Sequence, residues 1–197
     1  MSPLEKNVAV KMLREHLRDI PRFGLPDGYS LRGYQPGDEE TWLKIQLGAD
    51  RHNRITPELF EEQFGSARAS LPQRQCYLLD THGREVGTAT AWFDDNFEGA
   101  RVGRLHWVAM APEYQSRGLG KPLLTAVCHR LRELRHERVY LSTSSARLPA
   151  INLYLRFGFV PLIRSEHESF LWQRILDQTE SFPTPGVGLG RGARKPL

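Results

Sequence analysis

The sequence is poor in cysteine and has no long apolar run. Cys76 and Cys128 are the only two cysteines among 197 residues, which excludes a disulfide framework and a zinc cluster. No apolar run approaches the roughly 20 residues that a membrane span needs, and the first residues are too charged for a secretory signal. We therefore expect a cytoplasmic protein with no metal and no membrane partner.

A strong excess of positive charge is also missing. The net charge is +4 with a pI of about 9.3, but Arg191, Arg194 and Lys195 gather near the C-terminus with no acid beside them. Removing these three charges from +4 leaves about +1 for the rest of the chain. Proteins that bind nucleic acids need a basic surface that neutralises phosphates, so no nucleic-acid partner is expected.

The chain does contain enough apolar sequence for one folded domain. Hydrophobic residues make up 40% and charged residues 25%, as is usual for a soluble domain. In residues 1–21, apolar side chains such as Val8 and Met12 recur every four positions, which predicts an amphipathic helix. Residues 22–176 then form the domain. Residues 177–197 are a basic tail rich in proline and glycine, which predicts no packed structure.

Strand and helix signals alternate through the predicted domain and indicate an α/β protein. Strands are expected at 29–35, 75–80, 85–93, 103–110 and 138–144, and helices at 37–49, 56–64, 119–134 and 149–157. A helix between two apolar strands predicts that those strands are parallel neighbours joined by a crossover. Residues 159–163 and 168–176 are expected to close the sheet as its last strands.

The stretch "YQSRGLGKPLL", residues 114–124, places two glycines where a helix has to begin. Pro122 has no amide hydrogen and fits only near the first turn, so the helix cannot start much before Gly118. Glycines in this position have two readings. They can make a turn that needs unusual backbone angles, or they can let a phosphate approach the free amides of the helix N-terminus.

The surrounding residues favour the phosphate. "VAMAPEYQSRGLG" resembles the acyl-CoA-binding motif of the GNAT superfamily of N-acyltransferases, with Gln115, Gly118 and Gly120 at the motif's core positions. "PAINLYLRFGF" resembles a later helix of that family. The resemblance covers roughly residues 29–174 and implies a GNAT-like α/β (α+β) fold, with a central mixed, partly splayed sheet flanked by helices. The stretch is neither a Walker loop nor a dinucleotide fingerprint, because the residues that define those motifs are missing.

The resemblance implies roles for individual residues. Backbone amides of the loop would hold the pyrophosphate of acetyl-CoA, and backbone groups of Val108 and Met110 would pair with its pantetheine arm. The amide of Val108 would also polarise the thioester carbonyl. The loop residues implied are Gln115, Ser116, Arg117, Gly118, Leu119, Gly120 and Lys121.

Two side chains are candidates for proton transfer. Tyr154, four residues before Gly158, would protonate the departing thiolate, although the apolar helix around it also suits a core tyrosine. Period-two alternation places His106 on the same strand face as Val108 and Trp107 on the other, in the core. His106 titrates in the useful range and could accept the amine proton, or it could be a structural histidine.

The sequence departs from the family pattern in two places. Arg104 stands where many relatives carry a glutamate base, so His106, Glu98, Asp94, Asp95 or water would have to replace that group. A second departure is an arginine at position 147, where many relatives have an asparagine. Cys76 and Cys128 are expected in the core rather than as acyl carriers.

The resemblance implies an N-acetyltransferase that moves an acetyl group from acetyl-CoA to an amine by direct attack in a ternary complex. The acceptor would be a small-molecule or peptide amine, with residues 48–57 and 164–168 lining its site. The loss of the glutamate leaves a second interpretation open, an acyl-CoA-binding module without catalysis that senses acyl-CoA or holds a partner. The sequence also leaves a homodimer open.

Overall fold

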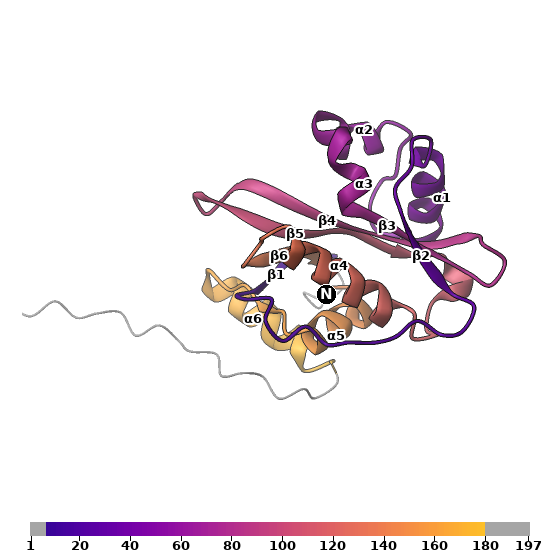
Figure 1. Cartoon of the computed structure of the whole chain (residues 1–197). Coiled ribbons are helices and arrows are strands. Elements are labelled where there is room, and N and C mark those ends of the chain that lie inside the picture. Colours follow the sequence, from indigo (N-terminus) through magenta and orange to yellow (C-terminus); the bar gives the residue numbers. More distant parts are fainter. Residues whose placement is uncertain (1–6, 180–197) are drawn as a thin grey trace, which may run out of the picture.

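The computed structural model describes residues 7–179, which form one twisted sheet with helices on both faces (Figure 1). The strands are β1 (Ala9–Arg14), β2 (Ser30–Gly33), β3 (Gln75–Leu79), β4 (Glu85–Phe97), β5 (Ala100–Met110), β6 (Val139–Ser144) and β7 (Val160–Pro161). The helices are α1 (Glu39–Ala49), α2 (Leu59–Phe64), α3 (Leu71–Arg74), α4 (Gly120–Glu133), α5 (Leu148–Arg156) and α6 (Glu166–Leu176). Short 3-10 turns, η2 (Gly65–Ser70) and η3 (Pro112–Tyr114), join them.

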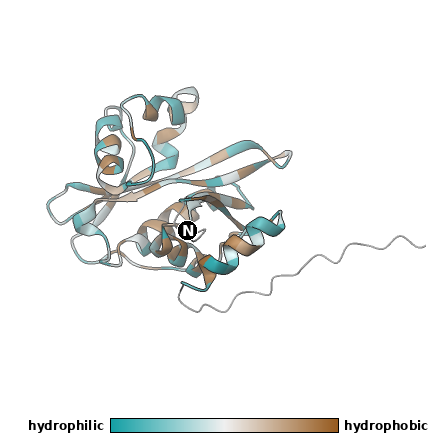
Figure 2. Cartoon of the chain, turned by 180° about the vertical axis from the view of Figure 1, so that it is seen from behind, coloured by the Kyte–Doolittle hydropathy of each residue, from teal (hydrophilic) through white to brown (hydrophobic). Residues whose placement is uncertain are grey.

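The sheet has the order β2-β3-β4-β5-β6-β1-β7 and is antiparallel except between β5 and β6. The mixed α/β sheet predicted from the sequence is therefore confirmed. One core packs α4, α5 and α6 onto one face, and a second core packs α1, α2 and α3 onto the other. Each helical layer mixes hydrophobic and hydrophilic residues, as expected for helices with one buried face (Figure 2).

The N-terminal segment is a strand where the sequence predicted a helix. β1 lies between β6 and β7 and pairs antiparallel with both, so the domain boundary predicted at residue 22 is also wrong. Residues four apart, such as Val8 and Met12, share a face in a strand as well as in a helix, so their spacing could not distinguish a helix from a strand. The neighbouring strands decided, because β6 and β7 pair with this segment, and Met12 is then completely buried in the core.

The C-terminal segment shows the reverse error. Residues 168–176, expected to be a strand, belong to helix α6. The Ser165 hydroxyl caps this helix by accepting the amide of Glu168 at 3.2 Å. Leu171, Trp172 and Ile175 are buried with helical spacing. The segment therefore packs its apolar face on the core as a helix. The tail predicted at 177–197 lies outside the described residues from position 180 onward.

A β-bulge interrupts β5 close to its end. Thr88 on β4 pairs with Ala109 and Thr90 pairs with His106, so two steps on β4 correspond to three on β5. Trp107, inside this interval, has a left-handed φ of 48°. One extra residue in one strand is the definition of a bulge, and it reverses the alternation of side chains beyond it.

The bulge overturns the predicted faces of β5. His106 lies on the face covered by α1 and α2, whereas Val108 packs with the core under α4 and α5. Trp107 does not lie opposite His106 either. Its ring contacts Trp42 of α1 at 5.2 Å between centroids and lies 5.8 Å from the His106 ring. Period-two alternation fails here because it assumes that the ladder has no extra residue.

β5 and β6 separate along their length. They pair in parallel only at Gly103 with Val139 and at Arg104 with Tyr140. Beyond Arg104, the edge of β5 that faces β6 has no strand partner within residues 7–179. The splayed sheet is thus confirmed, and the exposed backbone can pair with an extended ligand as an added strand would.

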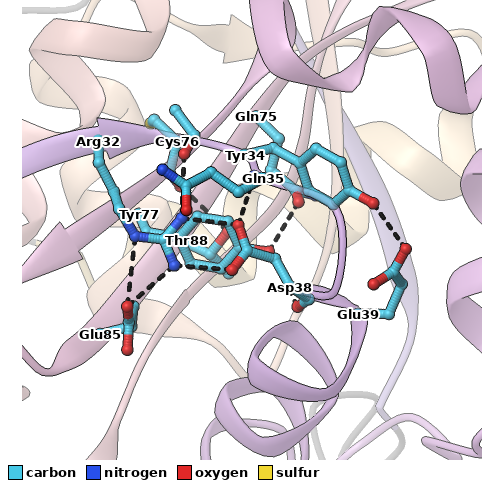
Figure 3. Close-up of polar contacts among 11 residues, drawn as sticks. Arg32, Tyr34, Gln35, Asp38, Glu39, Gln75, Cys76, Tyr77, Glu85 and Thr88 are labelled. Atoms are coloured by element: carbon cyan, nitrogen blue, oxygen red, sulfur yellow. Dashed lines mark hydrogen bonds and ion pairs between the residues drawn. The ribbon is translucent and has the colours of Figure 1, made fainter.

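A polar network fixes the loop between β2 and α1 (Figure 3). The Arg32 guanidinium makes a bidentate ion pair with Asp38 at 2.6 and 2.7 Å, and it also contacts Glu85 at 2.9 Å. The amide of Gln35 donates to the same Asp38 carboxylate at 2.6 Å. Burial alone would raise the pKa of Asp38, but the hydrogen bonds from Arg32 and Gln35 outweigh it and lower that pKa.

We expect Asp38→Asn to reduce the free energy of unfolding by about 3 kcal/mol at neutral pH, because it leaves Arg32 without its main partner. The Asp38 pKa is lowered in the folded state, so this contribution is complete above the unfolded value near ~4 and is lost as pH falls through the folded value. Urea unfolding at neutral and acid pH measures both effects. Glu85→Gln is the control, and its cost should stay below about 1 kcal/mol because Glu85 is more exposed. Equal losses in the two variants would contradict the assignment.

Candidate active site

A cavity of about 1320 Å³ opens where β5 and β6 separate. The loop before α4 and the first turns of α5 form one wall, and the end of α1 with the loop after it forms another. Both predicted proton-transfer residues, Tyr154 and His106, line this cavity. The fold therefore brings together residues that lie 48 positions apart in the sequence.

The loop before α4 contains several backbone amides that are unpaired within residues 7–179. Ser116 and Gly118 have left-handed φ angles of 59° and 78°. Within the described chain, the amides of residues 116–120 donate to no carbonyl or side chain. A Cβ built on Gly118 would meet no atom within 4 Å, so the space in front of this backbone is open. Consecutive free amides at a helix N-terminus are an anion-binding arrangement.

The other glycine has a packing role. A Cβ at Gly120 would come within 3.0 Å of the Leu153 side chain, so this glycine allows α4 to approach α5. Leu119 is buried in the core beneath the loop. Lys121 lines the cavity, and its ammonium lies 5.5 Å from the centroid of the Phe23 ring. Its amide donates to Gly118 at 3.2 Å, so this amide is not free for a phosphate.

Gln115 and Arg117 differ from the rest of the loop. The Gln115 amide donates to Pro112 at 3.2 Å, and its side chain donates to the Met110 carbonyl at 2.9 Å, which fixes the loop to the end of β5. Arg117 does not line the cavity, and its guanidinium lies 5.2 Å from the Tyr114 ring centroid. The amides available to an anion are thus those of residues 116–120, a narrower set than the sequence predicted.

Val108 and Met110 line the cavity from the unpaired part of β5. Both are half-buried and pack on the core beneath α4. One lone pair of the Met110 carbonyl is already used by Gln115. The pairing of their backbone groups with a ligand stays a prediction.

Tyr154 enters the cavity from α5. Its ring packs against Phe159 with 6.2 Å between centroids, and its side chain is 8% exposed. Among the described residues, its hydroxyl has no hydrogen-bond partner. Burial raises the pKa of Tyr154 to about 12, so the phenol keeps its proton at neutral pH. The side chain is thus packed in the core and also has a free donor at the cavity.

His106 is held by a residue that the sequence did not point to. The Nε2 atom lies 3.1 Å from the side-chain oxygen of Gln63, on α2. The indole nitrogen of Trp107 donates to the same oxygen at 3.0 Å. Gln63 sits in a polar helix segment with no motif around it, so no sequence signal could have identified it.

These contacts fix the protonation of His106. Indole N–H is only a donor, so the Gln63 atom that Trp107 contacts has to be the oxygen. An amide oxygen only accepts, so Nε2 of His106 carries the proton and Nδ1 carries the lone pair. Burial lowers the pKa of His106 well below its usual value, and the charge of Arg104 lowers it further. The ring is therefore neutral at physiological pH.

A family model matches the part of the chain that forms most of this site. Residues 39–159 match the acetyltransferase (GNAT) family. The chain belongs to this family. The matched segment runs from α1 to the end of α5 and includes the loop before α4, His106 and Tyr154.

Relatives among known proteins carry acetyltransferase names. The chain is 33% identical over 153 residues to a mycothiol acetyltransferase of Pseudarthrobacter chlorophenolicus, with 72% of this chain and 45% of the relative covered. It is 31% identical over 146 residues to a mycothiol acetyltransferase of Arthrobacter sp., with 72% and 45% covered. The chain thus spans about half the length of the curated relatives that it matches.

Solved structures of GNAT proteins share the fold. A GCN5-related N-acetyltransferase from Sphaerobacter thermophilus superposes with a TM-score of 0.66 at 23% identity, covering 79% of this chain and 49% of that one. A chain of the NatC complex, solved with Gag peptide and CoA, superposes with a TM-score of 0.58 at 15% identity, covering 69% and 87%. At these identities the likeness concerns the fold alone.

The acids proposed as substitutes for the missing GNAT glutamate lie elsewhere. Glu98 pairs with Arg164 at 2.7 Å, and Asp94 accepts the Tyr140 hydroxyl at 2.8 Å. Neither these acids nor Asp95 line the cavity. Within the described residues, Asp50 is the one acid that does.

Asp50 belongs to an ion pair across the cavity wall. Its carboxylate contacts Arg147 at 2.6 Å, and its side chain is 4% exposed. It also accepts the amides of His52 and Asn53 at 2.8 and 2.9 Å. The loop after α1 thus lines the cavity as predicted, whereas residues 164–168, the other predicted acceptor segment, do not. The arginine that replaces the family's asparagine here fixes this loop to the start of α5.

The two cysteines carry no reactive thiolate. Burial raises the pKa of Cys76 and Cys128 to about 12, so both thiols are protonated and unreactive at neutral pH. No group of three metal-binding side chains occurs in the described part of the chain. None of the helices between residues 7 and 179 is long and apolar enough to cross a membrane.

We expect Gln63→Glu to raise the pKa of His106 by roughly 1 to 3 pH units, because a carboxylate in that position stabilises the charged ring. Nitrogen–proton NMR of the imidazole, recorded without substrate, measures both the protonated atom and its titration. Gln63→Leu is the control, since it removes the hydrogen bond without adding charge and should leave the pKa low. A wild-type spectrum with the proton on Nδ1 would contradict the assignment.

Proposed function

We propose that this chain is an N-acetyltransferase that transfers the acetyl group of acetyl-CoA to an amine in a ternary complex. The observation that carries the proposal is the position of the separated strands β5 and β6 beside the free amides of residues 116–120. One feature accepts an extended arm, and the other accepts a phosphate at its end. Family membership and the names of the relatives support the same chemistry.

The residues present fit acetyl-CoA, which supplies an activated acetyl thioester when it is bound. The amides of residues 116–120 would hold the pyrophosphate, with Lys121 adding a positive charge. The open space in front of Gly118 is where a side chain would collide with the phosphate. The unpaired edge of β5 at Val108 and Met110 would hold the pantetheine arm.

In the proposed reaction, this chain moves two protons. The amine forms its bond to the acetyl carbon while the carbon–sulfur bond breaks. The amide of Val108 stabilises the negative charge that develops on the oxygen. Nδ1 of His106 accepts the proton that the amine loses and passes it to water, since its low pKa prevents it from keeping the charge. The Tyr154 hydroxyl donates its proton to the departing sulfur, and the phenolate then takes a proton back from water.

The second candidate is an acyl-CoA-binding module without catalysis. It is favoured by the lack of a free carboxylate in the cavity, where the one acid among the described residues is paired with Arg147. It is also favoured by the low pKa of His106, because a group that is hard to protonate is a weak base.

Release of the free CoA thiol from acetyl-CoA, measured with each member of a panel of acceptors, separates the two candidates. The panel would contain primary amines, amino acids, N-terminal peptides, aminoglycosides and the acceptor of the mycothiol acetyltransferases, with acetyl-CoA binding measured by calorimetry. We expect binding together with thiol release for at least one acceptor. Binding without release across the panel would favour the binding module, and no binding would reject both.

A further inference from the structure

The lining of the cavity has an excess of positive charge, and one of the cations lies away from the phosphate loop. Its lining contains five basic side chains and, among the described residues, a single acid, Asp50, which is ion-paired with one of those five. The basic residues are Arg51, Arg104, Lys121, Arg147 and Arg156. Lys121 lies at the phosphate loop, but Arg104 lies on β5 two residues from His106, where the acceptor would be.

Arg104 is placed to contact a bound acceptor. It forms the last pair between β5 and β6 before the strands separate. It precedes the bulge and therefore shares a face with His106. Its Nε atom is buried and has no hydrogen-bond partner, and within residues 7–179 no carboxylate lies within 4 Å of its guanidinium.

The charge of Arg104 helps to lower the pKa of Asp94, but the Asp94 carboxylate already has other hydrogen-bond partners. Asp94 accepts the amide of Asn96 at 3.0 Å and the Tyr140 hydroxyl at 2.8 Å, and it makes no ion pair with Arg104. The Arg104 guanidinium instead lies 5.6 Å from the Tyr140 ring centroid. The buried Nε of Arg104 is therefore left without a hydrogen bond, which is costly unless an acceptor group of a ligand meets it.

We infer that the acceptor amine carries an anionic group, a carboxylate or a phosphate, and that Arg104 binds it. The inference rests on the proposed function, because it names the class of substrate for that site. The planar guanidinium can make two parallel hydrogen bonds to either anion. A polycationic acceptor such as an aminoglycoside or a polyamine would instead meet Arg104 and Arg51 without a free acid in the described part of the cavity.

Binding of the anion would also help the neighbouring base. Arg104 contributes to the low pKa of His106, and burial contributes more. An acceptor anion on the guanidinium screens that repulsion and lets the ring accept a proton more readily. The amine would then be positioned by the same contact that prepares its base.

Matched acceptor pairs test the inference. One arm compares an amino acid with its carboxamide, and the other compares 2-aminoethyl phosphate with ethanolamine, so the two sources of the anion are distinguished. Wild type should favour the charged member of at least one pair by about 10-fold or more in kcat/KM. Arg104→Gln should remove that preference, so that the kcat/KM values of the charged and neutral members come within about 2-fold of each other. Arg104→Lys should restore part of it.

Arg101→Gln is the control, since it removes the same charge from the same strand outside the cavity. It should keep the wild-type preference. A wild type that favours neutral or cationic acceptors would overturn the inference, and so would an Arg104→Gln variant that lowers both members equally. Calorimetry of the same probes with the CoA-loaded chain gives a separate readout. Charge-dependent binding lost in Arg104→Gln would support the inference even if no acceptor is acetylated, which would reject only the proposed function.

Discussion

Tyr154→Phe is expected to lower kcat about 100-fold while leaving the affinity for acetyl-CoA within about 2-fold of wild type. The substitution keeps the ring and its contact with Phe159 but removes the proton that would go to the departing sulfur. General acid catalysis contributes roughly 10²-fold or more, which sets the size of the effect. Because the Tyr154 pKa is raised to about 12, the phenol stays protonated and wild type should show no loss of rate below about pH 9 from this group.

Steady-state kinetics on one acceptor measure this effect, and calorimetry measures the acetyl-CoA affinity. Tyr77→Phe is the matched control, since it also removes a buried hydroxyl but lies in the other core, where its hydroxyl donates to Gln75 at 2.8 Å. It should cost stability without lowering kcat. If Tyr154→Phe turns over like wild type, the phenol is structural and the proton comes from water or another group.

Gly118→Val is expected to weaken acetyl-CoA binding at least ~10-fold, about 1.4 kcal/mol. Two effects combine at this position. Valine is strained at the left-handed φ of 78°, and its branched side chain would occupy the open space where the phosphate would meet the backbone amides. Calorimetric titration with acetyl-CoA measures the change directly.

The control variant Gly83→Val separates the effect of backbone strain from the effect of a collision with the phosphate. Gly83 also has a left-handed φ, 74°, and open space around its Cβ position, but it lies in the turn between β3 and β4 and does not line the cavity. Both variants should lose similar stability in thermal unfolding, and only Gly118→Val should lose affinity. Unchanged affinity in Gly118→Val would reject the phosphate site, whichever reaction the chain performs.

The sequence by itself determined the local elements with strong signals. The loop before α4 was readable because glycine at a left-handed φ and proline in the first turn leave the chain few alternatives. The helix that carries Tyr154 and strands β2 to β6 were also readable, because their apolar spacing fits one regular structure. The parallel crossover between β5 and β6 followed from the order of these elements.

The tertiary structure decided the features that depend on distant partners. Residues 9–14 became a strand because β6 and β7 pair with both of its edges. Residues 166–176 became a helix that packs Leu171, Trp172 and Ile175 into the core. The bulge at Trp107 turned His106 away from Val108, which no alternation rule contains. The pairing of Gln63 with His106 joins residues 43 positions apart, and such contacts arise only when α2 packs on β5. A residue's neighbours along the chain fix its local geometry, but its chemistry here is set by side chains that only folding brings near.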